Sequence, residues 1–157
     1  VWEAIEVVSP AIVAVEYNAV LGDVHSLAIP YRADFIRGMA HHSNLYFGAS
    51  LPALISLGRE KGYTFVGSTT SGVNAFFVRD DLVKHITDHQ VSCFGYPSRV
   101  REARNPSGAL AFVSGVDRAT VIADLPLLDI ATGMETSLGR LEEIYSDCWI
   151  NGQGRAF

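Results

Sequence analysis

The sequence predicts an α/β fold, in which helices cover a β-sheet, and three parts of the chain support this prediction. Apolar residues of 50–61 recur at helical spacing, and two β-rich runs, 63–67 and 73–78, follow with a short polar turn between them. Residues 11–15 form a near-continuous apolar run, which is typical of a parallel strand with helices on both faces. We therefore expect a helix-covered sheet that ends in an antiparallel pair of strands.

The first residues, Val1-Trp2-Glu3-Ala4-Ile5, have the pattern of the middle of an amphipathic helix, because their apolar residues lie at helical spacing and no capping residue precedes them. Trp2 and Ile5 would face the sheet. This helix would end near Ser9-Pro10, since proline disfavours the helical conformation of the residue before it. We expect an N-terminal portion of the domain to lie upstream of this chain.

The helix at 50–61 has signals at both ends. Ser50 is suited to cap its first turn, and Pro52 lies where a missing N–H costs least. Gly62 is suited to the left-handed conformation that ends a helix. The apolar stripe that would pack on the sheet consists of Leu51, Leu54, Ile55 and Gly58.

The remaining segments are less regular. Residues 19–45 form a long connection with one extended piece at 26–30, and we expect it to lie over the strand ends as a substrate lid. Residues 83–157 are predicted to be a small α+β tail or subdomain, with a final helix at 135–145 and a frayed end at 151–157.

Composition limits the class of protein. A length of 157 residues with 48% hydrophobic side chains is enough for one domain with a core. The formal net charge of -5 argues against nucleic acid or an anionic membrane as the main partner. The apolar runs are far shorter than the roughly 20 residues that span a bilayer, and the two cysteines form no CxxC motif. We expect a cytoplasmic protein whose partner is a small molecule or another protein.

Polar residues follow the apolar run 11–15 directly, as Glu16-Tyr17-Asn18. In open α/β sheets ligands bind outside the carboxyl ends of the strands. Glu16 and Asn18 are therefore candidate catalytic residues, which would contact a substrate hydroxyl, act as a base or help to hold a divalent metal. The alternative is a capping or loop-anchoring pair that satisfies local backbone groups. Tyr17 is a candidate for substrate binding.

Four further residues are candidates for substrate binding. His41 and His42 suggest a proton-transfer pair or a metal ligand, but they lack the i, i+4 spacing of a helical metal site, and a solvated loop is the alternative. Tyr46 and Phe47 precede the helix at 50–61 and would wall a pocket for an apolar or sugar-like substrate. Core packing is the alternative for this aromatic pair.

A concentrated positive patch consists of Arg99, Arg101 and Arg104. Arginines in such a group can grip a phosphate or a carboxylate, although three arginines on a loop usually form a solvated face.

Several stretches resemble the carboxyl-terminal half of FkbM-like S-adenosylmethionine-dependent methyltransferases. They are VWEAI, PAIVAVEYNAVLG, SLAIPY and, as the most specific, YFGASLPALISLGREKGYTFVGSTTSGVNAFFVRDDL, and they lie within residues 1–82. The resemblance implies an incomplete part of a seven-stranded, Rossmann-like sheet whose last two strands form an antiparallel hairpin. It implies that Ile12 to Glu16 is the fifth strand, that Ser50 to Lys61 is the following helix and that 63–67 and 73–78 are the terminal pair.

The cofactor motif of that family is absent from this chain. The family binds S-adenosylmethionine with a glycine-rich turn after its first strand and an acidic residue after the second, whereas the only close Gly-x-Gly here is Gly152 with Gly154, in the tail. The resemblance therefore implies a carboxyl-terminal fragment that O-methylates a small hydroxylated substrate, sugar-like or metabolite, and is inactive without the missing N-terminal half. The alternative is a non-catalytic α/β domain that binds a ligand or, through its incomplete sheet edge, another protein.

Overall fold

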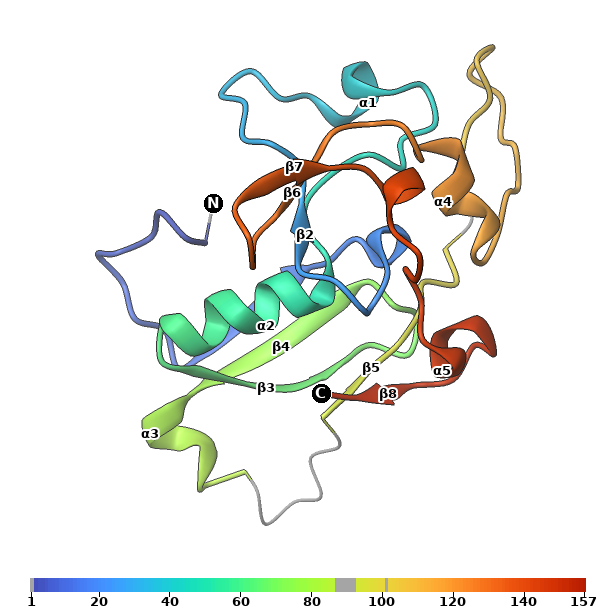
Figure 1. The fold of residues 1–157 in the computed structure, drawn as a ribbon. Coiled ribbons are helices and arrows are strands. Elements are labelled where there is room, and N and C mark those ends of the chain that lie inside the picture. Colours follow the sequence, from blue (N-terminus) through green and yellow to red (C-terminus); the bar gives the residue numbers. More distant parts are fainter. Residues whose placement is uncertain (1, 87–92, 101) are drawn as a thin grey trace.

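The computed structural model describes residues 2–86, 93–100 and 102–157, and a three-stranded antiparallel sheet lies at its centre (Figure 1). The strands are β1 (Ile12–Glu16), β3 (Tyr63–Ser68) and β4 (Asn74–Arg79), with β4 in the middle. The predicted antiparallel pair is confirmed as β3 and β4, and β1 pairs with the other edge of β4.

The helix α2 (Leu51–Glu60) lies across one face of this sheet (Figure 1). The Ser50 hydroxyl accepts a hydrogen bond from a first-turn amide at 3.4 Å, and Gly62 follows the helix with a φ of 77°. Gly58 allows a close approach, because a Cβ there would lie 2.9 Å from the ring of Phe77 in β4. The predicted helix, its cap and its end are therefore confirmed.

A second small sheet packs beyond α2. Its strands are β2 (Leu27–Ala28), β6 (Leu127–Asp129) and β7 (Met134–Thr136), in the order β2-β6-β7 and antiparallel. A third, two-stranded pair joins β5 (Phe94–Gly95) to β8 (Arg155–Ala156). The short helices are η1 (Ala19–Leu21), α1 (Arg37–Ala40), α3 (Asp80–Val83), α4 (Asp117–Val121), η3 (Leu138–Arg140) and α5 (Asp147–Ile150).

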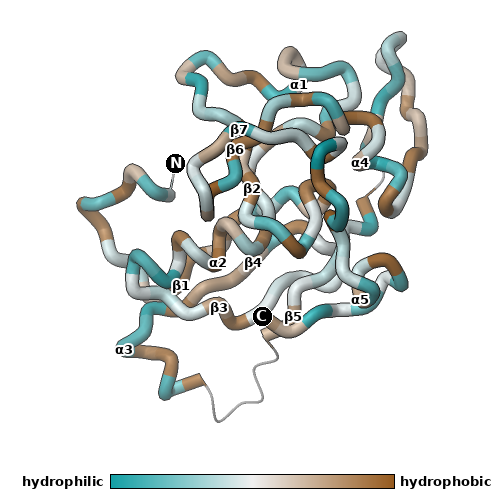
Figure 2. Tube along the Cα trace, in the orientation of Figure 1, coloured by the Kyte–Doolittle hydropathy of each residue, from teal (hydrophilic) through white to brown (hydrophobic). Residues whose placement is uncertain are grey.

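Two hydrophobic clusters hold these elements together. One lies between α2 and the central sheet, and the other lies between η1, the second sheet and α4. Residues beyond position 83 contribute to both, since Trp149 is buried in the first cluster and Leu138 in the second. Hydrophobic colouring in Figure 2 follows α2 and the strands against which it packs. The boundary at residue 83 therefore remains a prediction, and the segments on its two sides share their packing.

The arrangement is a mixed α/β structure of small antiparallel sheets and few helices. No helix in the described part of the chain is long and apolar enough to cross a membrane.

The strand β1 lies where it was predicted, but its surroundings differ. The apolar run 11–15 predicted a parallel strand buried on both faces, whereas β1 is antiparallel to β4, lies at the edge of the sheet and leaves Ile12 63% exposed. An apolar run identifies a strand, but which segments cover that strand is decided by tertiary contacts that the run does not encode.

The helix expected at the start of the chain is not formed by residues 2–11. Trp2 instead packs alone on the aromatic rings of Tyr63 and Phe77, at centroid distances of 5.7 Å and 4.9 Å. A short helix has a costly nucleus and needs a packed face to offset that cost, and here a single anchored side chain replaces the face.

The end of the chain also differs from its prediction. Residues 135–145 contain the end of β7 and the single turn η3 in place of a helix, because β7 pairs with β6 around a tight turn at Gly133, whose φ is 70°. Residues 151–157 are not frayed: they include β8, and the ring of Phe157 packs edge-on against Phe65 at 6.0 Å. Both segments are held by partners far away in the sequence, which local patterns do not reveal.

Candidate functional site

A cavity of about 160 Å³ lies at the carboxyl end of β1, and we call it the strand-end cavity. The loop after α1, the turn between β3 and β4, the segment after β5 and α4 supply its other walls. The lining residues are Glu16, Tyr17, Asn18, Ala19, Val20, Arg37, Leu45, Phe47, Gly72, Val73, Ser98, Val100, Glu102 and Arg118. Four of the seven predicted site residues are therefore brought together here.

Glu16 is the last residue of β1 and its side chain is exposed. Glu16 lines the strand-end cavity although its side chain is exposed, which places it at the rim of this cavity. In the described part of the chain no cation lies within ion-pairing distance of this carboxylate. Glu16 is consequently free to meet a polar group of a ligand.

Asn18 is 1% exposed, and all its polar atoms bond to the backbone. Its Nδ2 donates to the carbonyl oxygens of Leu45 at 2.8 Å and Phe47 at 2.9 Å, and its Oδ1 accepts from the Val20 amide at 3.0 Å. This is the loop-anchoring alternative that the sequence left open. The catalytic role of Asn18 remains a prediction, while its geometry is that of a positioning residue that fixes one wall of the cavity.

Tyr17 is 2% exposed and its hydroxyl donates toward Ser68 Oγ, at 3.1 Å, and the carbonyl oxygen of Tyr96. Burial raises the pKa of Tyr17, which keeps the phenol neutral. Its side chain therefore links β1 to β3 and to the segment after β5.

Phe47 forms a wall of the cavity together with Arg37, whose guanidinium carbon lies 3.7 Å from the centroid of the Phe47 ring. Arg37 Nε donates to the Asn44 carbonyl at 2.7 Å, and Arg37 forms an ion pair with Glu102. The charge of Arg37 is thus largely balanced by Glu102.

The other three candidates do not line the strand-end cavity. Tyr46 is buried in the second hydrophobic cluster, with its hydroxyl on the Pro126 carbonyl, which is the core-packing alternative. His41 Nδ1 lies 2.7 Å from Ser43 Oγ, and the His41 and His42 rings are tilted by 44° to each other with centroids 4.1 Å apart. Burial, and then the charge of His42, lower the pKa of His41. Among the described residues no group of three or more His, Cys, Asp or Glu side chains could hold a metal ion.

Arg118 is a charged lining residue that the sequence did not reveal. The sequence instead indicated a positive patch of Arg99, Arg101 and Arg104, whose members are close in sequence. Neither Arg99 nor Arg104 lines the cavity, and Arg101 lies outside the described residues. Arg118 is 5% exposed and lies in α4, between Asp117 and Ala119. A lone arginine in a short helical segment has no local signal that would mark it as buried.

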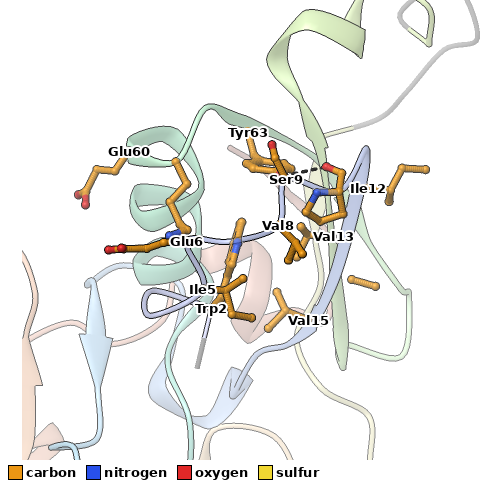
Figure 3. A pocket seen from close by; sticks show the side chains of 13 residues that line it. Trp2, Ile5, Glu6, Val8, Ser9, Ile12, Val13, Val15, Glu60 and Tyr63 are labelled. Atoms are coloured by element: carbon orange, nitrogen blue, oxygen red, sulfur yellow. Dashed lines mark hydrogen bonds between the residues drawn. The ribbon is translucent and has the colours of Figure 1, made fainter.

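A second cavity, of about 720 Å³, lies beside β1 and we call it the edge cavity. Figure 3 shows Trp2, Ile5 and Val8 of the N-terminal segment facing Val13 and Val15 of β1 across it. Its lining residues are Trp2, Ile5, Glu6, Val8, Ser9, Pro10, Ile12, Val13, Ala14, Val15, Glu60, Lys61 and Tyr63. The edge cavity is therefore largely apolar and follows the side of the strand.

The backbone of β1 is paired on one side. The Ala11 carbonyl and the Tyr17 amide both hydrogen-bond toward β4, and backbone groups alternate between the two sides of an antiparallel strand. Ile12, Ala14 and Glu16 therefore direct their N–H and C=O groups toward the opposite side, where the structure describes no further strand. This side of β1 is an open edge.

Comparison of the chain with models of protein families, with curated proteins and with solved structures finds no match.

Neither cavity fits S-adenosylmethionine. Sites for ligands of this size have volumes of about 300–1,000 Å³, which the strand-end cavity does not reach. The edge cavity is large enough, but no glycine lines it, so the backbone lacks the close approach that a glycine-rich turn provides. Gly154 is no substitute, because a Cβ there would lie 2.7 Å from the ring of Tyr96 and the position is filled by packing.

Proposed function

We propose that this chain is the carboxyl-terminal part of an FkbM-like S-adenosylmethionine-dependent methyltransferase that methylates a hydroxyl oxygen of a small, sugar-like or metabolite substrate. One observation is its main support: β1, α2 and the β3–β4 hairpin follow one another as the resemblance implies, and Glu16 and Asn18 border a cavity at the carboxyl end of β1. Ligands of open α/β sheets bind at this end of the strands. A Rossmann-like sheet is part of the proposal.

The open edge of β1 supports a role for a further segment of the same domain. Proteins rarely leave a flat, apolar strand edge uncovered. At the open edge of β1, the apolar side chains of Ile12 and Val8 are 63% and 62% exposed, which favours a further segment that covers them. In the proposal the N-terminal half of the domain pairs with this edge and supplies the glycine-rich cofactor site. The chain alone would then be inactive.

The residues of this chain would act on the substrate. Glu16 would accept the proton of the substrate hydroxyl as that oxygen becomes the nucleophile, because it is an exposed carboxylate at the rim of the cavity. Asn18 would hold the backbone of Phe47, and with it the wall that orients the substrate. S-adenosylmethionine, bound by the other half, would supply the methyl group.

The proposal is tested by calorimetric titration of the folded 157-residue chain with S-adenosylmethionine and with its demethylated product. We expect no binding by this chain and saturable binding once the upstream reading frame is added. Saturable binding by the chain alone would contradict the assignment of the cofactor site to the other half. Absence of binding in both forms would contradict the methyltransferase proposal.

The open edge also favours a second candidate function, a non-catalytic domain that binds another protein by strand addition. Such binding uses the free N–H and C=O groups of an edge strand for affinity and adjacent apolar pockets for specificity. The edge cavity lies in the right place for this, since it borders Ile12 and Ala14. This candidate predicts a partner for β1 but no binding of S-adenosylmethionine in any form of the protein.

A further inference from the structure

Arg118 is a buried cation to which the described residues offer only neutral acceptors. Its Nη1 donates to the Val100 carbonyl at 2.9 Å and to Ser98 Oγ at 3.3 Å, its Nη2 to the Ser98 carbonyl at 2.6 Å and its Nε to the Gly115 carbonyl at 3.3 Å. No carboxylate of the described chain lies within ion-pairing distance of this guanidinium. A buried charge is costly unless it is paired, and arginine remains protonated under all ordinary conditions.

The hydrogen bonds of Arg118 leave part of its fork available. A guanidinium has five N–H donors, and four contacts to described acceptors account for four of them. Arg118 also lines the strand-end cavity, so this charged side chain borders a space that a ligand can enter. The one remaining N–H can donate a single charge-assisted hydrogen bond to an oxygen of a carboxylate or phosphate.

The other charges around the cavity favour an anion with a single charge. Arg37 is paired with Glu102, which leaves Arg118 and Glu16 as the two lining charges without an ion-pair partner among the described residues. The cavity therefore offers one positive and one negative group to a ligand. Because Arg118 and Glu16 offset each other, a carboxylate adds one net negative charge to the site, whereas a phosphate dianion adds two and is repelled more strongly by Glu16.

The size of the cavity limits the ligand further. A volume of about 160 Å³ corresponds to about five water molecules, so the part of a ligand that it encloses has only a few heavy atoms. Phe47 and Val100 add apolar contact beside the polar groups.

We propose that the strand-end cavity binds a small hydroxycarboxylic acid, with its carboxylate on Arg118 and its hydroxyl group toward Glu16. The position of the hydroxyl rests on the proposed function, in which Glu16 accepts the proton of the methylated oxygen. The carboxylate site rests only on the burial and surroundings of Arg118. Hydroxy acids and sugar acids belong to this class of substrate.

The experiment uses the 157-residue chain labelled with ¹⁵N and titrated with acetate, glycolate, ethylene glycol and inorganic phosphate at constant ionic strength, followed by amide chemical shifts. We expect glycolate to bind with a dissociation constant of about 1 mM, which is in the range for a ligand of so few atoms. The shifts would map to the amides around Val73 and Val100. Acetate would bind more weakly, and ethylene glycol would not bind.

Three variants separate the contributions. Arg118→Met should weaken glycolate binding at least tenfold, while Arg59→Gln, which replaces an exposed arginine of α2 that does not line the cavity, should leave it unchanged. Glu16→Gln should tighten acetate binding about threefold, because a nearby negative charge is removed, and should abolish the preference for glycolate over acetate. If Arg118→Met does not fold, Glu16→Gln still tests the proposal, because Glu16 is exposed and its replacement should not disturb folding.

Four results would overturn the proposal: no saturable binding of glycolate by the folded chain, chemical shifts that map elsewhere, tighter binding of phosphate than of glycolate, or unchanged constants in Glu16→Gln. None of these measurements uses S-adenosylmethionine. Failure of the cofactor titration would therefore leave the carboxylate site standing, and failure here would leave the methyltransferase proposal to its own test.

Discussion

Replacement of Asn18 distinguishes a positioning residue from a catalytic one by its effect on stability. The side chain is 1% exposed and makes three hydrogen bonds to the backbone, at 2.8, 2.9 and 3.0 Å. A typical hydrogen bond contributes about 1 kcal/mol net, so Asn18→Ala should lower the free energy of unfolding by about 3 kcal/mol. The carbonyl groups of Leu45 and Phe47 lose their donor, and the wall of the strand-end cavity loosens.

Asn18→Asp should be more damaging at neutral pH although the side chain keeps its shape. The new carboxylate would still accept from Val20, but it would face two carbonyl oxygens without a proton to donate, and we expect a loss of about 4 kcal/mol or more. Burial next to these oxygens raises the pKa of the new carboxyl group in the folded state above its unfolded value. The folded state then binds the extra proton, so the deficit relative to the wild type should shrink as the pH is lowered and grow as it is raised.

The assay is urea unfolding at pH 5 and pH 7, followed by tryptophan fluorescence and circular dichroism. Asn105→Asp is the matched control. Asn105 Oδ1 accepts hydrogen bonds from Ser107 and Ala109, and a carboxylate oxygen at this position can accept the same bonds. We expect that control to remain within about 0.5 kcal/mol of the wild type. If both Asn18 variants lose less than about 1 kcal/mol, the positioning role is refuted and Asn18 is free for chemistry.

Two further predictions concern the ends of the fold. The Asp23 carboxylate has no exposed surface and accepts from the Ser146 amide at 2.8 Å and the Ser146 hydroxyl at 2.6 Å, so Asp23→Ala should cost about 3 kcal/mol in urea unfolding. The exposed Asp124→Ala is the control, and a loss for Asp23→Ala no larger than that of the control would contradict the reasoning. The open edge of β1 should make the isolated chain self-associate in sedimentation velocity, and Ala14→Pro, which removes an N–H on the open side, should weaken association without unfolding the sheet. Val13→Pro, whose N–H faces β4, should instead destabilise the fold, and a wild-type chain that stays monomeric at every concentration would refute the expectation.

The elements that the sequence predicted well are those whose signals are local. Ser50, Pro52 and Gly62 identify both ends of α2, and the polar turn after residue 67 separates β3 from β4. Capping, left-handed glycine and hairpin formation each depend on a few consecutive residues, so their evidence lies within one short stretch.

The candidate site was predicted in part. One cavity is lined by Glu16, Tyr17, Asn18 and Phe47, because the end of β1 and the segment before α2 meet there. A site at the carboxyl end of a strand is what an open α/β sheet predicts. His41, His42 and Tyr46 do not line it, since adjacency in sequence does not determine the direction in which side chains point. Arg118 joins the site from 100 residues beyond Asn18, through packing of α4 on η1.

The sequence by itself determined the helix, the hairpin and the polar end of β1, because each follows from the conformational preferences of neighbouring residues. Only the tertiary structure decided that β1 is an open edge, that Arg155 and Ala156 near the end of the chain pair as β8 and that Arg118 is buried with no carboxylate of the described residues within ion-pairing distance. These features depend on which distant segments exclude water from one another. Burial and pairing are properties of the assembled chain, and no local pattern contains them.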